Sequence, residues 1–383
     1  MQDAQGICRV LVLGGYGHFG ARIVHALAGE ANVEVIVAGR SATQQGPMTF
    51  ADLPAQCRER LRFANLDTTS VDLAQQLSAW QPALVIHTAG PFQGQGYAVA
   101  EACLRAAAHY VDLADGRDFV RDFPAQMDAA ARAAGRAAIT GVSTLPAISS
   151  AVVDALFDHF DALREIDIVI APAQRTPLGL ATVRAVLSYC GVPFRCWQEG
   201  RWQRVTGWRR PERVTFAHLR PRLASPCDVP DHDLLVARYP GVHSVRFRAA
   251  LELPFLQRAL AMIGALRQWG IPVPMAALGP FFSRASRWFD HFGSDLGGMY
   301  VELRGESDGR ARVLRWDLTA PALHGPEIPC LAAVLLARRL ANRGTLPVGA
   351  YACMGLLKLA HFNDAFASWG IETAITVTEQ PAD

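Results

Sequence analysis

Near the N-terminus the chain reads Val10-Leu11-Val12-Leu13-Gly14-Gly15-Tyr16-Gly17-His18-Phe19-Gly20, and Ala21-Arg22-Ile23-Val24-His25-Ala26-Leu27 follows at once. Apolar residues lead into clustered glycines and then into a helical run, the order of a strand, a tight turn and a helix. The glycines fit G-x-G-x-x-G and an overlapping G-x-x-G-x-x-G. Such glycines let the backbone approach a pyrophosphate, and the helix start offers N–H groups to it. The alternative is an ordinary tight turn. The predicted dinucleotide contacts are Gly14, Gly15, Tyr16, Gly17, His18, Phe19 and Gly20.

Short apolar segments alternate with helical segments through residues 1–145. The expected strands are 9–13, 33–38, 61–65, 83–88, 110–113 and 137–140. The expected helices are 21–28, 71–80, 97–108 and 119–134. This alternation predicts an α/β fold whose N-terminal part is a Rossmann domain, a doubly wound parallel sheet.

The pattern changes near residue 146. Two pairs of strand-like segments, 194–198 with 202–205 and 299–305 with 310–318, flank short turns and predict hairpins. Residues 146–324 are therefore expected to form a second, α+β domain with an antiparallel sheet. We expect residues 325–383 to form a C-terminal helical segment that packs back on the Rossmann domain.

Composition excludes several functional classes. The formal net charge of +2 gives no electrostatic case for a nucleic-acid partner. The eight cysteines form no C-x-x-C pair and predict reduced thiols in a cytoplasmic protein. The apolar stretch 260–282 is interrupted by Arg267, Gln268, Pro272 and Pro274, so buried helices are expected there and membrane contact is not. Lys358 is the only lysine, so Schiff-base catalysis would have to use it.

The residues after the second expected strand predict which dinucleotide binds. NAD sites commonly carry an acidic residue about 20 residues past the glycine turn, where it bonds the ribose 2′-hydroxyl. This chain has Arg40 and Ser41 there. A guanidinium pairs with a 2′-phosphate through two aligned N–H groups, so the pattern predicts NADP. The alternative is a surface arginine at a strand end, with NAD bound weakly.

Further cofactor contacts are expected at the ends of the third and fourth strands. Asp67 either bonds the adenine edge or forms a turn before Thr68. Ala89, Gly90 and Pro91 follow the fourth strand, where doubly wound folds bind ligands, although an ordinary turn fits as well. His18 either approaches the cofactor or fills a variable motif position with its side chain turned away.

Several motifs together resemble the saccharopine dehydrogenase-like oxidoreductases. They are the glycine turn, Ala38-Gly39-Arg40, Gly90-Pro91-Phe92, Ala100-Glu101-Ala102-Cys103 and Tyr110-Val111-Asp112-Leu113. The match covers about the first 145 residues. It implies an NADP(H)-binding Rossmann domain and a second domain that shapes the site of a small-molecule substrate and mediates homodimer contacts. Related chains often have Ser-Gly-Glu after the Asp-Leu pair, whereas this chain has Ala114-Asp115-Gly116.

The reaction that this resemblance implies is hydride transfer to or from a C=N bond of an amino- or keto-acid-derived substrate. Asp112, Asp115 and Arg117 follow the fifth strand and are the expected catalytic residues, with Arg117 available for a substrate carboxylate. The alternative is a salt-linked turn and helix start. Other functions left open are reduction of an alkene or carbonyl in a larger apolar substrate and non-catalytic NADP(H) binding. Weaker candidates are Ser143, Thr144, His87, His218, Tyr239, His243, Arg246 and Lys358.

Overall fold

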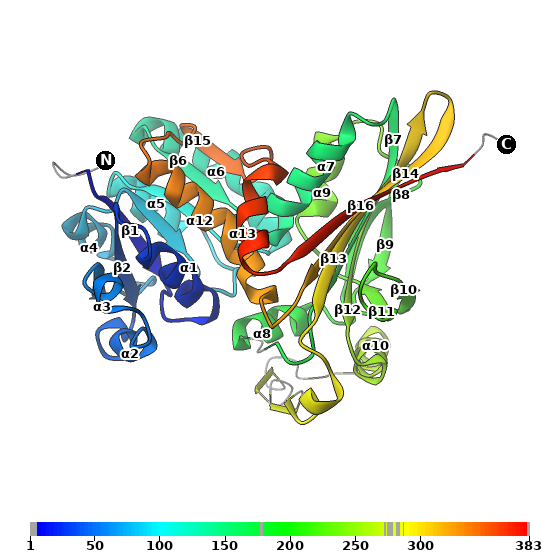
Figure 1. The fold of residues 1–383 in the computed structure, drawn as a ribbon, viewed down its shortest axis with the longest axis horizontal. Helices are drawn as coiled ribbons and strands as arrows, with labels where there is room; N and C mark the ends of the chain where they lie inside the picture. Colours follow the sequence, from blue (N-terminus) through cyan, green and yellow to red (C-terminus); the bar gives the residue numbers. More distant parts are fainter. Residues whose placement is uncertain are drawn as a thin grey trace. The chain divides into compact units, whose positions relative to one another are not determined.

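The computed structural model describes residues 6–176, 179–271, 273, 279–280, 284–285 and 287–380. The contacts divide the chain into two compact units. Unit 1 consists of residues 1–147 and 327–357, and unit 2 consists of residues 148–326 and 358–383 (Figure 1). No helix of the described chain is long and apolar enough to cross a bilayer.

Unit 1 contains a seven-stranded parallel sheet with the order β15-β6-β5-β4-β1-β2-β3. Its strands are β1 (Cys8–Leu13), β2 (Val33–Gly39), β3 (Leu61–Asn65), β4 (Leu84–His87), β5 (His109–Asp112), β6 (Ala137–Thr140) and β15 (Gly349–Ala352). Val10 to Leu13 are fully buried, as expected for a central parallel strand covered on both faces. The predicted Rossmann sheet is confirmed. The strand order reverses between β1 and β4, since β2 and β3 follow on one side of β1, and β4, β5 and β6 follow on the other.

The helices of unit 1 connect these strands. They are α1 (His18–Ala28), α2 (Ala42–Thr49), α3 (Ala55–Arg58), α4 (Leu73–Trp80), α5 (Ala98–Arg105), α6 (Arg117–Ala134) and α12 (Ile328–Ala341). α12 packs against α1, where the Cys330 thiol donates to the Phe19 carbonyl oxygen at 3.5 Å. Arg22 of α1 forms an ion pair with Glu327 at 3.0 Å. The segment around α12 therefore belongs to the core of unit 1.

Unit 2 contains a nine-stranded mixed sheet. Its main order is β10-β11-β12-β7-β13-β14-β16, and the hairpin β8–β9 joins it through β12. β7 and β12 run parallel, whereas the other pairs are antiparallel, so the expected antiparallel sheet is found with one parallel pair. The strands are β7 (Ala162–Ala171), β8 (Pro193–Gln198), β9 (Arg201–Thr206), β10 (Glu212–Val214), β11 (Arg222–Pro226), β12 (Ser244–Leu251), β13 (Gly297–Ser307), β14 (Arg310–Ala320) and β16 (Glu372–Gln380).

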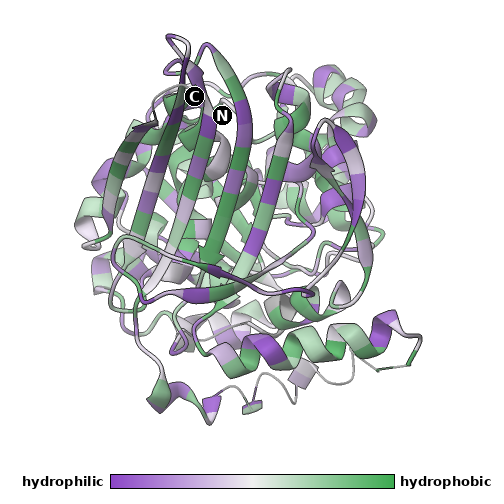
Figure 2. Cartoon of the chain, turned by 90° about the vertical axis from the view of Figure 1, so that its right-hand side faces the viewer, coloured by the Kyte–Doolittle hydropathy of each residue, from purple (hydrophilic) through white to green (hydrophobic). Residues whose placement is uncertain are grey.

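Residues alternate between the two faces of this sheet. Ile166, Ile168, Val301 and Leu303 are fully buried on one face, where α7 contacts β13 and α9 contacts β12. Charged residues occupy the intervening positions, and Figure 2 shows the resulting hydrophilic and hydrophobic bands along the strands. The helical segments of unit 2 are α7 (Ser149–Phe157), α8 (Leu180–Ser188), α9 (Asp231–Arg238), α10 (Pro254–Gln268), η2 (Asp290–Phe292), η4 (Leu359–Phe362) and α13 (Asn363–Ser368). Two short segments, η1 (Thr144–Ile148) and η3 (Gly325–Glu327), span the boundaries between the units.

The C-terminal segment differs from the expected helical segment 325–383. After α12 the chain forms β15, which extends the parallel sheet of unit 1, and then β16, which pairs with β14 in unit 2. The sequence of β16, Glu-Thr-Ala-Ile-Thr-Val-Thr-Glu-Gln, is rich in β-branched residues, which favour a strand over a helix. The segment is thus divided between the two units.

Candidate functional site

The glycine turn is closed by direct backbone contacts. Gly14 has φ +78°, a conformation that glycine adopts without strain. A Cβ added at Gly14 would stand 2.8 Å from the Thr88 hydroxyl oxygen, and one added at Gly20 would stand 2.2 Å from the Gly14 carbonyl oxygen. Side chains at these two positions would therefore push α1 away from β1 and β4.

The start of α1 leaves backbone donors available. Gly17 precedes the helix, and its N–H donates to the Gly14 carbonyl oxygen at 2.8 Å. Within the described chain no side chain caps this end, and no hydrogen bond takes the amides of His18, Phe19 and Gly20. Three unpaired N–H groups at the positive end of a helix form an anion-binding arrangement.

The loop after β4 lies directly beside this turn. The Thr88 hydroxyl donates to the Leu13 carbonyl oxygen at 2.8 Å and so joins the ends of β4 and β1. Gln95 holds the loop from the other side, because its Nε2 donates to the carbonyl oxygens of Ala89 at 3.2 Å and Pro91 at 2.6 Å. Ala89 and Gly90 therefore stand at the reversal between β1 and β4, where open α/β sheets bind ligands.

Residues at the end of β2 form the third part of the site. Tyr16 bridges from the glycine turn, since its hydroxyl oxygen accepts the Ser41 N–H at 3.3 Å. Arg40 is exposed, and no hydrogen bond or ion pair within the described residues fixes its guanidinium. Directly after Ser41, α2 begins at Ala42. Sequence reasoning missed this helix, whose N-terminus adds a positive end beside Arg40.

Asp67 adopts the geometry of a turn. Its Oδ1 accepts the backbone N–H of Thr69 at 2.9 Å and the Thr69 hydroxyl at 2.8 Å. These hydrogen bonds lower the pKa of the Asp67 carboxyl, and the charge of Arg40 lowers it further. Asp67 thus stabilises the loop after β3 and stays close enough to Arg40 to interact with it electrostatically.

Asp112 is fully buried at the end of β5. Its Oδ1 accepts three hydrogen bonds of 2.9 Å, from the N–H groups of Ala114 and Gly141 and from the Thr140 hydroxyl. Burial raises the pKa of the Asp112 carboxyl to about 6, and the same hydrogen bonds oppose the rise. This geometry joins the ends of β5 and β6, and the catalytic role expected for Asp112 stays a prediction.

The other two predicted catalytic residues lie further along the same loop. Asp115 is exposed, and its Oδ1 accepts Gln93 Nε2 at 3.1 Å, which connects the loops after β4 and β5. Arg117 is the first residue of α6 and is 9% exposed. The structure therefore brings Asp115 toward the loop of Gly90 and Pro91, whereas Asp112 points into the protein.

Two histidines of unit 1, His18 and His87, are held neutral. Burial, with a smaller contribution from Arg22, lowers the pKa of His18 to about 4. The buried His87 has its pKa lowered to about 4 by desolvation, and its Nδ1 lies 3.1 Å from the Tyr110 hydroxyl. Both side chains are consistent with packing roles at neutral pH, although the contact of His18 with a cofactor stays a prediction.

The candidates in unit 2 are spread over its surface and interior. Ion pairs engage Arg246, which lies 3.8 Å from Asp167 and 3.9 Å from Glu165. His218, His243 and Lys358 are exposed, and Tyr239 is buried and bonds Asp154. The structure gives these residues no common centre. Part of the apolar stretch 260–282, where buried helices were expected, lies outside the described residues.

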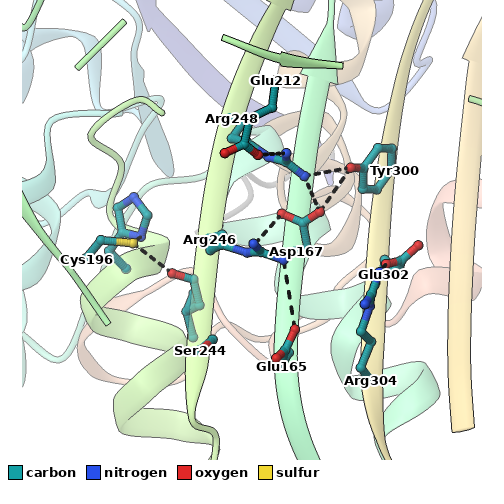
Figure 3. Close-up of polar contacts among 12 residues, drawn as sticks. Glu165, Asp167, Cys196, Glu212, Ser244, Arg246, Arg248, Tyr300, Glu302 and Arg304 are labelled. Carbon is teal, nitrogen blue, oxygen red and sulfur yellow. Dashed lines mark hydrogen bonds and ion pairs between the residues drawn. The ribbon is translucent and has the colours of Figure 1, made fainter. Parts of the chain in front are cut away.

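A buried charge network lies on one face of the sheet in unit 2 (Figure 3). Arg248 contacts Asp167, Glu212 at 2.8 Å and the Tyr300 hydroxyl oxygen at 3.0 Å. That hydroxyl donates to Asp167 at 3.0 Å. Arg248 also stands beside Arg246 on β12, and both arginines share Asp167 as an acidic partner. Among the described residues no group of three or more histidines, cysteines or acids could hold a metal ion.

Comparison with known proteins finds a similar domain in the part of the chain that carries this geometry. Residues 10–139 match the family model of the saccharopine dehydrogenase NADP binding domain. A search of curated proteins found no matching sequence. The predicted resemblance is therefore confirmed for the part of the chain that carries the glycine turn and the loops after β2, β4 and β5.

Two solved structures are similar over nearly the whole chain. Apo saccharopine dehydrogenase (L-Glu forming) from Saccharomyces cerevisiae has a TM-score of 0.68 at 12% identity, covering 97% of this chain and 100% of that chain. The homospermidine synthase from Legionella pneumophila, solved with NAD, has a TM-score of 0.58 at 10% identity, covering 97% and 91%. At these identities the likeness shows the fold. Residues 10–139 are therefore similar to the saccharopine dehydrogenase NADP binding domain, and the whole chain shares its fold with these two structures.

Proposed function

We propose that this protein is an NADP(H)-dependent oxidoreductase that transfers hydride to or from the C=N bond of an amino- or keto-acid-derived substrate. The observation that carries the proposal is the uncapped N-terminus of α1 at the reversal between β1 and β4. Three backbone amides are available there for a pyrophosphate, and the surrounding contacts leave room for glycine alone at Gly14 and Gly20.

The preference for NADP over NAD rests on the end of β2. The exposed guanidinium of Arg40, the Ser41 hydroxyl and the N-terminus of α2 form a cluster of donors without a carboxylate at the position of Arg40. A 2′-phosphate carries close to two negative charges, which this cluster would neutralise, whereas a 2′-hydroxyl would gain little from it. Asp67 stands nearby, but its Oδ1 is already engaged by Thr69.

For the chemical step we assign roles to three residues of the loop after β5. When bound, the nicotinamide supplies or accepts the hydride. Asp115 is the proposed proton donor and acceptor for the substrate nitrogen, because it is exposed beside the loop of Gly90 and Pro91. Arg117 is proposed to bind a substrate carboxylate. Asp112 holds the loop through its three hydrogen bonds and does not itself exchange protons with substrate.

The cofactor part of the proposal is tested by titrating the purified protein with NADPH and with NADH while following nicotinamide fluorescence. We expect tighter binding of NADPH. Gly20→Ala should abolish both binding curves, because its Cβ would stand 2.2 Å from the Gly14 carbonyl oxygen. The matched control is Gly29→Ala at the other end of α1, where the nearest atom would be 3.8 Å away and binding should persist.

The substrate part is tested by following NADPH oxidation with pairs of a 2-oxo acid and an amine, including 2-oxoglutarate with lysine. Turnover that requires both partners supports imine reduction, and Asp115→Asn should then lower kcat much more than it changes NADPH affinity. Binding of NADPH without turnover for any pair would contradict the proposed reaction and leave the cofactor assignment intact.

A further inference from the structure

Helix α10 of unit 2 has one buried face and one exposed face. It lies at one end of the nine-stranded sheet, where it contacts β11 and β12 (Figure 1). Gln257 fixes the buried face, because its side-chain amide donates to the Ser225 hydroxyl at 2.8 Å and accepts the Leu251 N–H at 2.9 Å. The residues buried on this side are Gln257, Leu260, Ala261, Gly264 and Ala265. The opposite side of the helix is therefore turned away from the sheet.

The exposed face of α10 carries large apolar side chains. Phe255, Met262 and Trp269 follow one another at intervals of seven residues, or about two helical turns, so they lie on one side of the helix. Met262 is 64% exposed, and Trp269, directly after the helix, is 73% exposed. A surface helix of a globular protein usually carries polar and charged residues on this side. The exposed apolar stripe thus marks a contact surface.

Residues 287–292 add further exposed rings beside the start of α10. The ring of Phe289 packs edge-on against that of Phe255, with the two centroids 5.0 Å apart. Trp288 is 68% exposed and Phe292 is 67% exposed. In the rest of the described chain no phenylalanine or tryptophan side chain is more than 37% exposed. Exposed aromatic rings are therefore concentrated on this part of unit 2.

The charges around this apolar face are almost all positive. The sequence of residues 254–292 contains four arginines and one aspartate. Arg258, Arg284 and Arg287 are exposed, and no ion pair joins them to another residue that the structure describes. The single acid, Asp290, is hydrogen-bonded within the protein. The face thus combines apolar rings with guanidinium groups that no carboxylate neutralises.

We propose that this face, formed by the exposed side of α10 and by residues 287–292, binds the surface of a bilayer that contains anionic phospholipids. The apolar side chains enter the boundary between head groups and acyl chains, and the guanidinium groups bind lipid phosphates. Tryptophan suits such a boundary, because its ring is apolar and its N–H can bond a polar head group. The helix lies along the membrane surface, and the contact is peripheral.

The proposal departs from the expectation that the stretch 260–282 forms buried helices without membrane contact. That expectation rested on the arginine and the prolines that interrupt its apolar run. A helix that lies in the bilayer surface needs only one apolar face and tolerates such residues. The sequence alone does not reveal which side of α10 packs on the sheet and which side stays exposed.

Other occupants fit this face less well. A second copy bound through the same face would bring the arginines of both copies together, since a two-fold interface opposes a surface to itself. An acidic protein would neutralise the arginines, but Phe255, Met262 and Trp269 project from a convex helix. A fluid bilayer can surround such side chains more completely than a folded protein can.

Co-sedimentation of the full chain with vesicles tests the proposal. Binding should be clear with equal parts of phosphatidylcholine and phosphatidylglycerol, weak with phosphatidylcholine alone, and lowered by salt. Met262→Asp should weaken binding to the anionic vesicles about 10-fold to 100-fold, because one apolar side chain is no longer buried in lipid. The matched control is Val71→Asp, which adds the same charge at a 95% exposed apolar side chain in unit 1 and should bind like wild type.

The contribution of charge is tested at one arginine of the helix. Arg258→Gln should weaken binding to the anionic vesicles about fivefold and reduce the dependence on salt. Arg58→Gln removes the same charge at an exposed position of unit 1 and should bind like wild type.

Tryptophan fluorescence tests how the face meets the bilayer. Lipids with brominated acyl chains quench only those tryptophans that reach the chains, so wild type should be quenched on binding. Replacing Trp269 and Trp288 together by phenylalanine should remove most of this quenching. Trp202→Phe, at an exposed tryptophan of β9, should leave it unchanged.

Several results would overturn the proposal. They are a chain that binds no vesicle, equal binding to both kinds of vesicle, and a Met262→Asp variant that binds like wild type. If Met262→Asp instead abolishes a self-association seen by sedimentation velocity and vesicles are not bound, a second copy covers this face. Circular dichroism of each variant shows whether lost binding reflects a lost fold.

Discussion

The two sheets of this molecule carry their polar groups in different ways. In unit 1 the central strands are fully buried, and the donors at their carboxyl ends are backbone amides around Gly14 to Gly20, with few charged side chains involved. In unit 2 the long strands β7, β12 and β13 carry charged side chains on one face, where Asp167 and Arg248 form an ion pair and the Tyr300 hydroxyl is hydrogen-bonded to both. The first arrangement can bind a ligand through main-chain geometry, whereas the second uses its charges internally.

The largest expected effect is a loss of stability at Arg248, which forms the buried ion pair with Asp167. Arg248→Ala leaves Asp167 buried without its main partner, so the free energy of unfolding of unit 2 should fall by about 3–5 kcal/mol. The control is Arg304→Ala, which removes a surface ion pair with Glu302 and should cost less than about 1 kcal/mol. Urea unfolding measures both. If the two variants lose the same stability, the network on the face of the sheet is not what stabilises unit 2.

Asp112 differs from the rest of this region of unit 1. It is a buried carboxylate, whereas the other polar groups at the strand ends are mostly backbone amides. Its pKa of about 6 in the folded state exceeds the ordinary value of about 4, so between these pH values the folded protein binds more protons than the unfolded protein. Its contribution to stability is therefore lost as pH rises from about 4 to about 6, by about 3 kcal/mol. Asp112→Asn keeps an acceptor for the three hydrogen bonds and removes this pH dependence.

Urea unfolding of wild type and Asp112→Asn at several pH values between about 4 and 7 checks this prediction. The stability of the variant relative to wild type should increase by about 3 kcal/mol across that range. Asp118→Asn, at an exposed carboxylate in the first turn of α6, should follow the wild type. Parallel curves for wild type and Asp112→Asn would show that the carboxyl is already ionised throughout.

The fold of unit 1 could be predicted because each element carries its own local signal. Strands such as β1 and β2 are short apolar runs, and the glycines mark the turn between β1 and α1. The helix α2 escaped prediction because Gly46 and Pro47 interrupt its sequence, and both residues are poor helix formers. β15 escaped because its strand character depends on pairing with β6, which lies far away in the sequence.

The candidate site was predictable to the extent that backbone geometry follows from glycine spacing. Gly14, Gly20 and Arg40 stand where the motif and the strand ends led us to expect them. The role of Asp112 was not predictable, because the sequence does not reveal that its carboxylate turns inward to Thr140 and Gly141. The partnership of Asp167 with Tyr300 joins residues 133 positions apart, and no local pattern marks such a pair.

Substitution of Arg40 tests whether one side chain gives a preference for NADPH over NADH to a site whose other donors are backbone amides. Arg40→Ala should weaken NADPH binding by about 10-fold to 150-fold, the equivalent of one charge-assisted hydrogen-bonded pair of about 1.5–3 kcal/mol. NADH affinity should stay the same, because the 2′-hydroxyl does not need the guanidinium. Arg58→Ala, at another exposed arginine of unit 1, is the control for lost positive charge. Equal losses of affinity for NADPH and NADH would mean that Arg40 does not recognise the 2′-phosphate and acts through its general positive charge or through folding.

The smallest effect is expected at His18, which lies inside the glycine turn but contributes to the proposed site through its N–H group. Because its pKa is about 4, the imidazole is neutral from about pH 6 to 7 and cannot pair with a phosphate as a cation. His18→Ala should change NADPH affinity by less than about 0.5 kcal/mol, roughly twofold. Fluorescence titrations at about pH 6 and pH 7 should give the same small difference. A tenfold loss of NADPH affinity, or a loss that is larger at pH 6 than at pH 7, would mean that the charged imidazole takes part in binding. That result would contradict the inference that backbone amides alone bind the phosphates at the glycine turn.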